Sequence, residues 1–316
     1  MRASRFLGEG RIGVVETPEP TGGVRLQVLA CALCGSDLRP WRQGWPVTPG
    51  HEVLGRVDQP GDVLHGSRAL LYIPAFCGHC AECRAGRTNL CEAMPPLLGW
   101  QVPGGYAELV AAPRQCLMPL PDWVPNRLAP LLLDTIGTVA HGVRQAHRVV
   151  EPGPALVLGA GPIGLGAILV LRRFGFKPIH VIEPASYRGQ VAAELGALPA
   201  DAQDPPRTLL VVEASGKDAA RQLAMEAVAP GGAVVQLGES DAWHLTETRP
   251  IRRKDFFLIR SFYFPFSDLA ENFELLRDDE ADYARLVDDT ADLDGLDGLF
   301  AAFARGERLK PLFVPS

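Results

Sequence analysis

The sequence has no excess of basic residues. Its 316 residues include 31 Lys and Arg against 37 Asp and Glu, which gives a net charge of −6 at pH 7. Proteins that bind nucleic acids or anionic membrane surfaces neutralise phosphates with clustered Lys and Arg. We therefore expect neither a nucleic acid nor a membrane among the partners of this protein.

A continuous apolar segment and an export signal are also absent from the sequence. Residues 152–171 carry no charge over a length that could cross a bilayer, but glycines and prolines interrupt the run. The first twenty residues contain no apolar stretch followed by a small-residue cleavage site. We therefore expect a cytoplasmic protein whose cysteines stay reduced.

Cysteine is scarce, yet four of the seven cysteines fall in one short stretch. Cys77, Cys80, Cys83 and Cys91 are separated by two, two and seven residues. Four thiolates at such spacing can surround one zinc ion at about 2.3 Å and leave no open coordination position, as in structural zinc sites. The alternative, four buried or disulfide-bonded cysteines, belongs to oxidising compartments.

The pattern of apolar residues divides the chain into two kinds of sequence. The first 125 residues have short alternating segments, such as 24–30, and little helical periodicity, which predicts a mostly β domain. Later segments alternate between strand-like and helix-like patterns. We expect strands at 155–158, 179–182, 209–212 and 233–237, and helices from Pro162 and over 218–228. This alternation predicts an α/β fold with a doubly wound parallel sheet.

A glycine-rich turn follows the first of these strands. Gly159, Gly161 and Gly164 fit the pattern G-x-G-x-x-G, and Pro162 and Ile163 open the helix after it. In such turns the first glycine bends the chain, the second lets the backbone approach a pyrophosphate, and the third lets the helix pack on the strand. We therefore expect these residues to bind a dinucleotide at the helix N-terminus.

The identity of the dinucleotide depends on Glu183, which ends the second strand. A carboxylate about twenty residues after the glycine turn can hold the ribose hydroxyls of NAD and would repel the 2′-phosphate of NADP. Arg188 keeps NADP open as an alternative, and Glu183 could also be a solvated loop carboxylate. Ser215 and Gly238 follow later strands, and we expect them to face the cofactor.

Two loops of the β domain offer metal ligands of the catalytic type. Cys34 lies in Cys-Gly-Ser-Asp and His51 in Gly-His-Glu, each after a strand-like segment. A thiolate and an imidazole bind catalytic zinc, although an isolated pair of this kind is also compatible with simple packing.

Together these blocks resemble the zinc-dependent medium-chain dehydrogenase/reductase family, which includes alcohol, polyol and threonine dehydrogenases. The likeness lies in ALCGSD, PGHEVLG, the four-cysteine lobe, GGYAELV, the glycine turn and VVEASG, and it runs nearly end to end. It implies a β-rich GroES-like catalytic domain over 1–125 that contains the zinc lobe at 77–91. A Rossmann domain would cover 126–262, and residues 263–316 would return to the catalytic domain.

The resemblance also implies a catalytic zinc ion bound by Cys34, His51 and Asp134. Glu52 is the alternative to Asp134 as third ligand, and Asp134 could instead cap a helix. Ser36 matches the hydroxyl that relays the alcohol proton in this family. With the four-cysteine lobe, the protein would bind two zinc ions per chain.

The implied reaction is zinc-assisted hydride transfer between an alcohol and NAD, with NADP the less favoured cofactor. The substrate would be a secondary alcohol, polyol, sugar or amino-alcohol, and the protein would form a homodimer or homotetramer. Two alternatives remain, a threonine-dehydrogenase-like enzyme and a catalytically silent binding protein on the same scaffold. Arg39 replaces a proton-relay histidine found in many relatives. Because arginine does not release its proton, the substrate proton needs another route.

Overall fold

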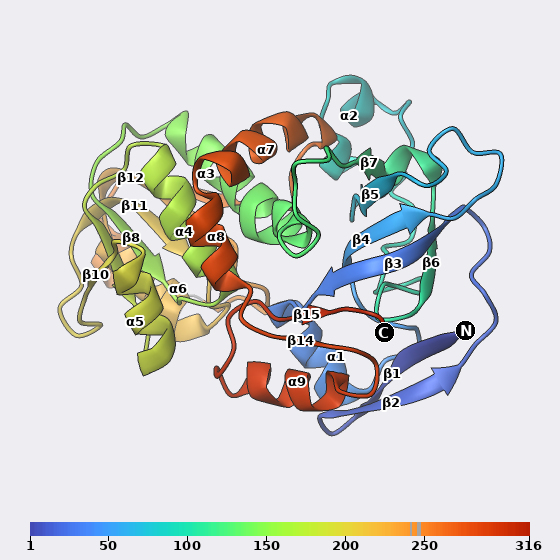
Figure 1. The fold of residues 1–316 in the computed structure, drawn as a ribbon. Coiled ribbons are helices and arrows are strands. Elements are labelled where there is room, and N and C mark those ends of the chain that lie inside the picture. The colour runs from blue at the N-terminus through green and yellow to red at the C-terminus, as the bar shows by residue number, and fades with distance from the viewer. Residues whose placement is uncertain (241, 245–247) are drawn as a thin grey trace. The chain divides into compact units, whose positions relative to one another are not determined.

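The protein folds into two compact units (Figure 1). The computed structural model describes residues 1–240, 242–244 and 248–316. Unit 1 contains residues 1–133, 265–267 and 284–316, and unit 2 contains residues 134–264 and 268–283. Each unit is described below by itself.

Unit 2 is built on a six-stranded parallel sheet with the order β10-β9-β8-β11-β12-β13. Numbered along the chain, the strands have the order 3-2-1-4-5-6, which is that of a dinucleotide-binding sheet. The strand order reverses between β8 and β11, and we call this place the reversal point. The doubly wound α/β fold expected from the sequence is therefore confirmed. The strands are β8 (Ala155–Leu158), β9 (Ile179–Ile182), β10 (Leu198–Pro199), β11 (Thr208–Glu213), β12 (Val228–Gln236) and β13 (Phe257–Arg260).

Helices pack on both faces of this sheet. On one face α6 (Asp218–Ala227) covers Leu156, Val211 and Val234 and forms an apolar cluster with them. On the other face α3 (Val139–His147) and α4 (Pro162–Arg173) lie against the alternate residues of the same strands. Alternate side chains of a strand point to opposite faces, so both faces are apolar and both are covered. The short helix α5 (Ser186–Glu194) follows β9.

Unit 1 is built mainly from antiparallel strands, as the first 125 residues predict. Its larger sheet has the order β14-β15-β3-β4-β5-β7, with β6 also paired to β3, and β1 and β2 form a separate hairpin. The elements are β1 (Arg2–Gly8), β2 (Arg11–Glu16), β3 (Val24–Ala32), α1 (Leu38–Gln43), β4 (Glu52–Val57), β5 (Arg68–Leu71), α2 (Ala81–Arg84), β6 (Leu109–Ala112), β7 (Leu117–Pro119), β14 (Thr290–Ala291), α9 (Leu296–Ala304) and β15 (Leu312–Phe313).

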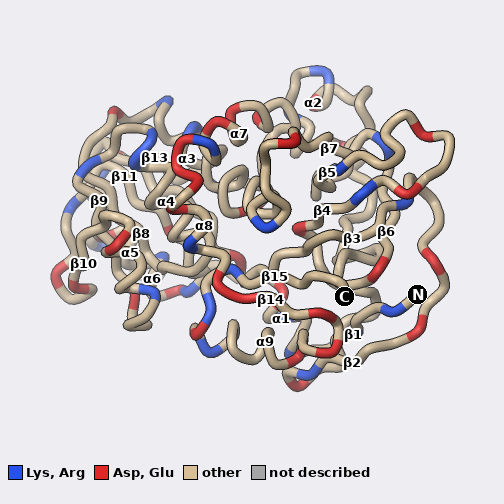
Figure 2. Tube along the Cα trace, viewed as in Figure 1, with Lys and Arg blue, Asp and Glu red and all other residues tan. Residues whose placement is uncertain are grey.

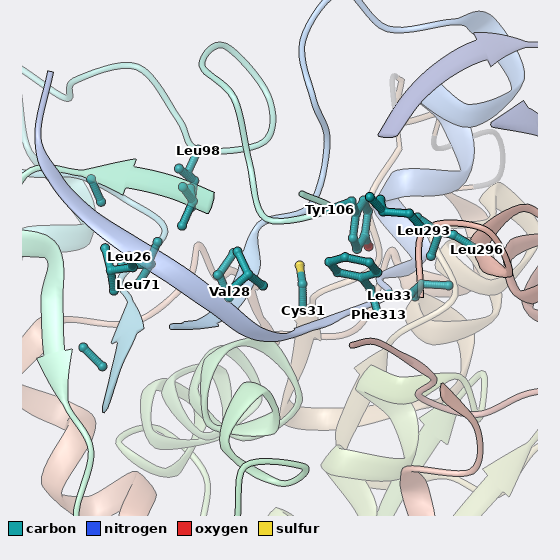
Figure 3. Packing of buried hydrophobic residues seen from close by; sticks show 14 of the residues in the cluster. Leu26, Val28, Cys31, Leu33, Leu71, Leu98, Tyr106, Leu293, Leu296 and Phe313 are labelled. Carbon is teal, nitrogen blue, oxygen red and sulfur yellow. The ribbon is translucent and has the colours of Figure 1, made fainter. Parts of the chain in front are cut away.

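The core of unit 1 joins both ends of the chain. One apolar cluster contains Leu26 and Val28 of β3 and also Leu33, which directly follows this strand. Leu296 of α9 and Phe313 of β15 belong to the same cluster (Figure 3). Leu312 and Phe313 also pair with Ala32 and Cys31 as the strand next to β3. The return of the last residues to the first domain, expected from the resemblance, is therefore present for β14, α9 and β15.

The segment between these parts differs from the expectation. Residues 263–264 and 268–283 belong to unit 2, and the second of these stretches includes α7 (Leu269–Asp278), although 263–316 was assigned as a whole to the catalytic domain. Arg144 of α3 pairs with Asp268 at 2.7 Å and with Glu271 at 3.0 Å, and these ion pairs connect the start of α7 to α3. The helix α8 (Glu280–Leu286) then crosses the boundary between the two sets of residues.

Charged residues of both signs are interspersed along the trace of each unit (Figure 2). Among the described residues, no helix combines the length and the apolar character needed to span a bilayer.

Replacing Asp268 with Asn should destabilise unit 2 in a pH-dependent way. Burial raises the pKa of Asp268, but His141 and Arg144 outweigh burial, so the pKa of Asp268 lies below its usual value of 3.8. A lowered pKa means that the stabilisation is present above pH 3.8 and is lost as the pH falls through the folded-state pKa. We expect the variant to lose about 1 kcal/mol at neutral pH.

Urea unfolding of wild type and Asp268→Asn, followed by circular dichroism at several pH values, measures this difference. The two stabilities should converge in acid. A difference that stays constant or widens below pH 3.8 would contradict the role given to this carboxylate.

Candidate functional site

The four clustered cysteines lie around a common centre in unit 1. Their sulfur atoms are all within 4.8 Å of one another, and none of them forms a disulfide. The Sγ atoms of Cys77 and Cys83 are 4.0 Å apart, as are those of Cys80 and Cys91. Four sulfurs bound tetrahedrally at about 2.3 Å from one zinc ion would be about 3.8 Å apart. The donor set therefore fits a zinc ion without rearrangement of the chain.

Backbone N–H groups lower the pKa of Cys77 and of Cys80 and so favour the thiolate forms of these two side chains. N–H groups of Cys83 and Glu92 lower the pKa of Cys80 to about 6. Burial and a hydrogen bond with the Cys80 side chain raise the pKa of Cys83 to about 12. Cys83 therefore becomes a thiolate at neutral pH only beside a cation, and a divalent metal ion supplies that charge.

The cysteine lobe is tied to the rest of unit 1 through Thr88. The Thr88 hydroxyl lies 3.1 Å from the Tyr72 hydroxyl and accepts a hydrogen bond from the backbone N–H of Phe266 at 2.8 Å. Phe266 also packs edge-on against the ring of Tyr72. The lobe thus anchors residues 265–267, which join two stretches of unit 2.

A second group of metal-binding side chains lies at the ends of β3 and β4. Ligand atoms of Cys34, His51 and Glu52 are within 4.8 Å of one another, and all three residues are buried. Cys34 follows β3 by two residues, and His51 and Glu52 stand at the start of β4, which pairs with β3. The register of two neighbouring strands therefore brings together side chains that are distant in sequence.

Asp37 fixes the imidazole of this group, and sequence reasoning gave it no role. Its Oδ1 lies 3.3 Å from Nδ1 of His51, while its Oδ2 accepts hydrogen bonds from the Cys34 N–H and the Tyr106 hydroxyl. A carboxylate at Nδ1 leaves Nε2 available to a metal ion and orients the ring. The signal was present in the sequence, because Asp37 follows Cys34 by three residues in the spacing of a capping box.

Glu52 is engaged by a buried lysine. The Lys310 ammonium donates a hydrogen bond to Oε1 of Glu52, and both side chains are 0% exposed. The two residues are 258 positions apart in the chain, so no local pattern could indicate this pair. Breaking such a pair would leave an uncompensated buried charge.

Ser36, Arg39 and Asp134 were also expected near the catalytic zinc or its proton relay, and each lies in a different element. Ser36 is half-buried in the 3₁₀ turn η1 (Gly35–Asp37), and Arg39 is half-buried in α1. Asp134 is buried and begins unit 2 in the π-helical turn η5 (Leu133–Thr138), directly after the last residue of the first stretch of unit 1. Its carboxylate accepts a hydrogen bond from the Thr138 hydroxyl at 3.0 Å. Its role as a zinc ligand stays a prediction.

Two of the three glycines in the G-x-G-x-x-G turn are sterically required in unit 2. Gly159 has φ +93°, where an L side chain is strained. Gly164 packs so closely that a Cβ atom would lie 1.8 Å from the carbonyl oxygen of Gly159. Gly161 is the N-cap of α4 and faces open space, so no side chain caps the helix. Together with Pro162 and Ile163 at the start of α4, this arrangement leaves a helix N-terminus suited to a pyrophosphate.

Glu183 lies directly after β9 and contacts the glycine turn. One carboxylate oxygen accepts a hydrogen bond from the Ala160 N–H at 2.6 Å, and the other accepts one from the Ala185 N–H at 2.8 Å. The carboxylate is therefore held in place beside the turn rather than fully solvated. Arg188 is half-buried in α5.

Ser215 and Gly238 follow β11 and β12, the strands on the other side of the reversal point. A Cβ atom on Gly159 would lie 3.0 Å from Cβ of Ser215, so the two loops touch. A Cβ atom on Gly238 would lie 2.1 Å from the backbone nitrogen of Gly216. The structure thus brings together the loops that sequence analysis assigned to cofactor binding, and their ligand stays a prediction.

Comparison with known proteins identifies relatives for both units. Residues 20–122 match the alcohol dehydrogenase GroES-like domain family. An L-threonine 3-dehydrogenase from Stenotrophomonas maltophilia (strain K279a) is 33% identical over 230 residues, which are 68% of this chain and 64% of that protein. The alignment therefore spans less than two thirds of the length of this relative.

Solved structures give the same result over the full chain. The alcohol dehydrogenase TADH from Thermus sp. ATN1 has a TM-score of 0.89 and 28% identity, with 100% of both chains covered. Galactitol-1-phosphate dehydrogenase from Escherichia coli has a TM-score of 0.87 and 24% identity over 100% of both chains, a likeness of fold. With its GroES-like β unit, dinucleotide-binding sheet and four-cysteine lobe, the chain belongs to the zinc-dependent medium-chain dehydrogenase/reductase family.

Proposed function

We propose that this protein is an oxidoreductase that transfers hydride between an alcohol and NAD at a zinc centre. The observation that carries the proposal is the buried group of Cys34, His51 and Glu52 in unit 1. A thiolate, an imidazole and carboxylates placed together in this way are the donors of a catalytic zinc site. Unit 2 adds a glycine turn of the type that holds a dinucleotide.

In this proposal Cys34, His51 and Asp134 hold the catalytic zinc ion. Lys310 supports this assignment, because its ammonium donates a charge-assisted hydrogen bond to Oε1 of Glu52 and so competes with direct coordination by that carboxylate. When bound, zinc acts as a Lewis acid on the alcohol oxygen. Asp37 keeps His51 in the orientation that presents Nε2 to the ion.

The proton of the alcohol would leave through Ser36, whose hydroxyl lies two residues after Cys34 in a turn that is partly open to solvent. Proton transfer through a positioned side chain contributes about 10²- to 10⁴-fold to rate. Arg39 cannot replace a histidine in this relay, since its guanidinium stays protonated. Beyond Ser36 the proton therefore needs water or hydroxyl groups of the bound cofactor.

NAD is the proposed cofactor, with NADP less favoured. Glu183 supports this choice, because its carboxylate is fixed beside the glycine turn where an adenosine ribose would lie. A negative charge at that point opposes binding of a 2′-phosphate. NAD would accept the hydride at its nicotinamide ring.

A threonine-dehydrogenase-like activity is the second candidate. The L-threonine 3-dehydrogenase match favours it, as does Asp134 with Gly137 in the segment that supplies the third ligand. Both candidates need the same zinc centre and cofactor, so they differ only in the alcohol.

A substrate panel with a Cys34→Ala control tests the proposal. Simple alcohols, polyols, sugars and L-threonine are each incubated with NAD and, separately, with NADP, and NADH or NADPH absorbance is followed. We expect turnover of at least one alcohol with NAD, and a loss of at least about a hundredfold in Cys34→Ala, because the Lewis acid is lost. Cys116→Ala is the matched control, since Cys116 is buried outside both cysteine groups.

Failure of wild type to oxidise any of these alcohols with either cofactor would favour a silent binding protein. Equal rates for wild type and Cys34→Ala would remove the zinc centre from the mechanism.

Removal of zinc from the four-cysteine lobe should loosen the lobe selectively. The N–H groups of Cys77, Cys80 and Cys83 donate hydrogen bonds to cysteine sulfurs, and these bonds would open more readily once no metal ion holds the four sulfurs together. After treatment with a strong chelator, we expect exchange of these amides to accelerate at least about tenfold by hydrogen-exchange mass spectrometry. Amides of β11 in unit 2 are the internal control. Identical exchange with and without chelator would argue against a structural metal ion.

We also propose that the protein is cytoplasmic and forms a homodimer through β13. This strand is the edge of the unit 2 sheet, and it exposes Phe257 at 49% and Leu258 at 45%. An apolar edge strand offers unpaired backbone groups to another strand, and a second copy can supply an identical edge in antiparallel orientation. The absence of disulfides among the cysteines supports a reducing compartment.

Light scattering coupled to gel filtration tests the dimer. We expect wild type to elute as a dimer or a larger oligomer and Leu258→Asp to dissociate, since a buried charge is costly at an interface. Leu198→Asp is the control, because Leu198 is 50% exposed on β10 at the opposite edge of the same sheet. A monomeric wild type, or equal dissociation by both variants, would exclude β13 as the interface.

A further inference from the structure

One face of the unit 2 sheet ends in two buried polar side chains. Leu156, Val211 and Val234 pack against α6 along this face. Two residues beyond Val211 and Val234 the same face carries Glu213 and Gln236, which are register partners on β11 and β12. Their exposures are 0% and 3%. Burial of two apolar side chains at this position would cost less free energy. The presence of a carboxylate therefore indicates a role other than packing.

The carboxylate of Glu213 accepts hydrogen bonds from the loop that follows it. Oε1 accepts from the Ser215 N–H at 2.7 Å, the Ser215 hydroxyl at 2.6 Å and the Gly216 N–H at 2.9 Å. Oε2 accepts from Nε2 of Gln236 at 2.6 Å. Because both carboxylate oxygens accept hydrogen bonds, the free-energy cost of burying the carboxylate is offset. One side chain thereby fixes the conformation of residues 213–216.

Gln236 extends the same network to the loop after β12. Its Nε2 also donates to the carbonyl oxygen of Gly238 at 3.0 Å. Gly238 itself packs on the carboxylate, because a Cβ atom there would lie 2.6 Å from Oε2 of Glu213. On the other side Ser215 touches Gly159 of the glycine turn. Hydrogen bonds of one carboxylate therefore connect the loops after β11 and β12, and the first of these two loops also touches the glycine turn.

These loops lie where a doubly wound sheet binds its ligand. The ligand of such a sheet lies outside the carboxyl ends of the strands at the reversal point, here between β8 and β11. Each half of the sheet binds one mononucleotide, so β8 to β10 hold the adenosine half and β11 to β13 hold the other. Glu213 and Gln236 belong to the second half.

We propose that Glu213, acting through Ser215 and Gln236, is a positioning residue that shapes the loops after β11 and β12 to receive the nicotinamide half of the cofactor. This inference rests on the proposed function, since it requires a nicotinamide dinucleotide. It assigns to Glu213 no contact with the reacting atoms. Its effect is on the conformation of the backbone at residues 215, 216 and 238.

Glu213→Gln tests the proposal with the smallest change in shape. A glutamine side chain has one accepting oxygen and one donating NH₂ group. If the NH₂ group replaces Oε1, it faces the N–H groups of Ser215 and Gly216, and if it replaces Oε2, it faces Nε2 of Gln236. In either case two donors oppose each other. We expect NADH affinity, measured by isothermal titration calorimetry, to fall about tenfold. AMP fills only the adenosine half, so its affinity should change less than about twofold. Glu226→Gln on α6 is the matched control and should bind both ligands like wild type.

Gln236→Met provides a second variant in case Glu213→Gln does not fold. It removes the donor to Gly238 and should also weaken NADH more than AMP. Unchanged NADH affinity in the folded variant, or equal losses of NADH and AMP, would overturn the proposal. If wild type binds NADH and the folded variant binds it with the same affinity, this inference is overturned and the proposed function is not. Wild type that binds neither NADH nor AMP overturns the proposed function and this inference with it.

Discussion

The structure depends on the pairing of ionisable side chains that it buries. Cys34, His51 and Glu52 are no more than 7% exposed in unit 1, and Glu213 is fully buried in unit 2. A buried charge without a partner costs several kcal/mol, roughly the whole net stability of a domain. Each of these groups is therefore surrounded by specific donors, acceptors or opposite charges, and the chain around each group is correspondingly constrained.

The partners come from distant parts of the chain and so hold the units together internally. In unit 1 the pair of Glu52 with Lys310 links β4 to the C-terminal segment, and β15 then completes the sheet beside β3. In unit 2 Asp268 links α7 to α3 through Arg144. Such pairs add little net stability compared with apolar packing. Removal of one partner is nevertheless strongly destabilising, because the other charge stays buried without compensation. Their main effect is to determine which segments pack together, and their contribution to the stability of that packing is smaller.

Local spacing was enough to predict the features that depend on neighbours in sequence. The strands at 155–158 and 179–182 were predicted with their observed bounds, because short apolar runs between glycines and prolines have few other readings. The four-cysteine lobe and the glycine turn were found because each packs its chemistry into a few consecutive residues. In the glycine turn, Gly159 is required by its positive φ and Gly164 by close contact with the backbone of Gly159.

Partners separated by a hundred or more residues left no such signal. Lys310 gives no hint in sequence that it will meet Glu52, and Arg144 gives none that it will meet Asp268 and so connect α7 to α3. In the sequence Glu213 is only one residue of the stretch VVEASG, because its role depends on the register of β11 with β12. Pairing of this kind is a property of the fold, and only the assembled sheet reveals it.

The central claim is that the two groups of metal-binding side chains in unit 1 each contribute to a zinc site. Zinc measured by elemental analysis of freshly purified protein, divided by the protein concentration, tests this most directly. The account requires two zinc ions per chain. One ion per chain in a preparation that oxidises its alcohol at full rate would contradict it.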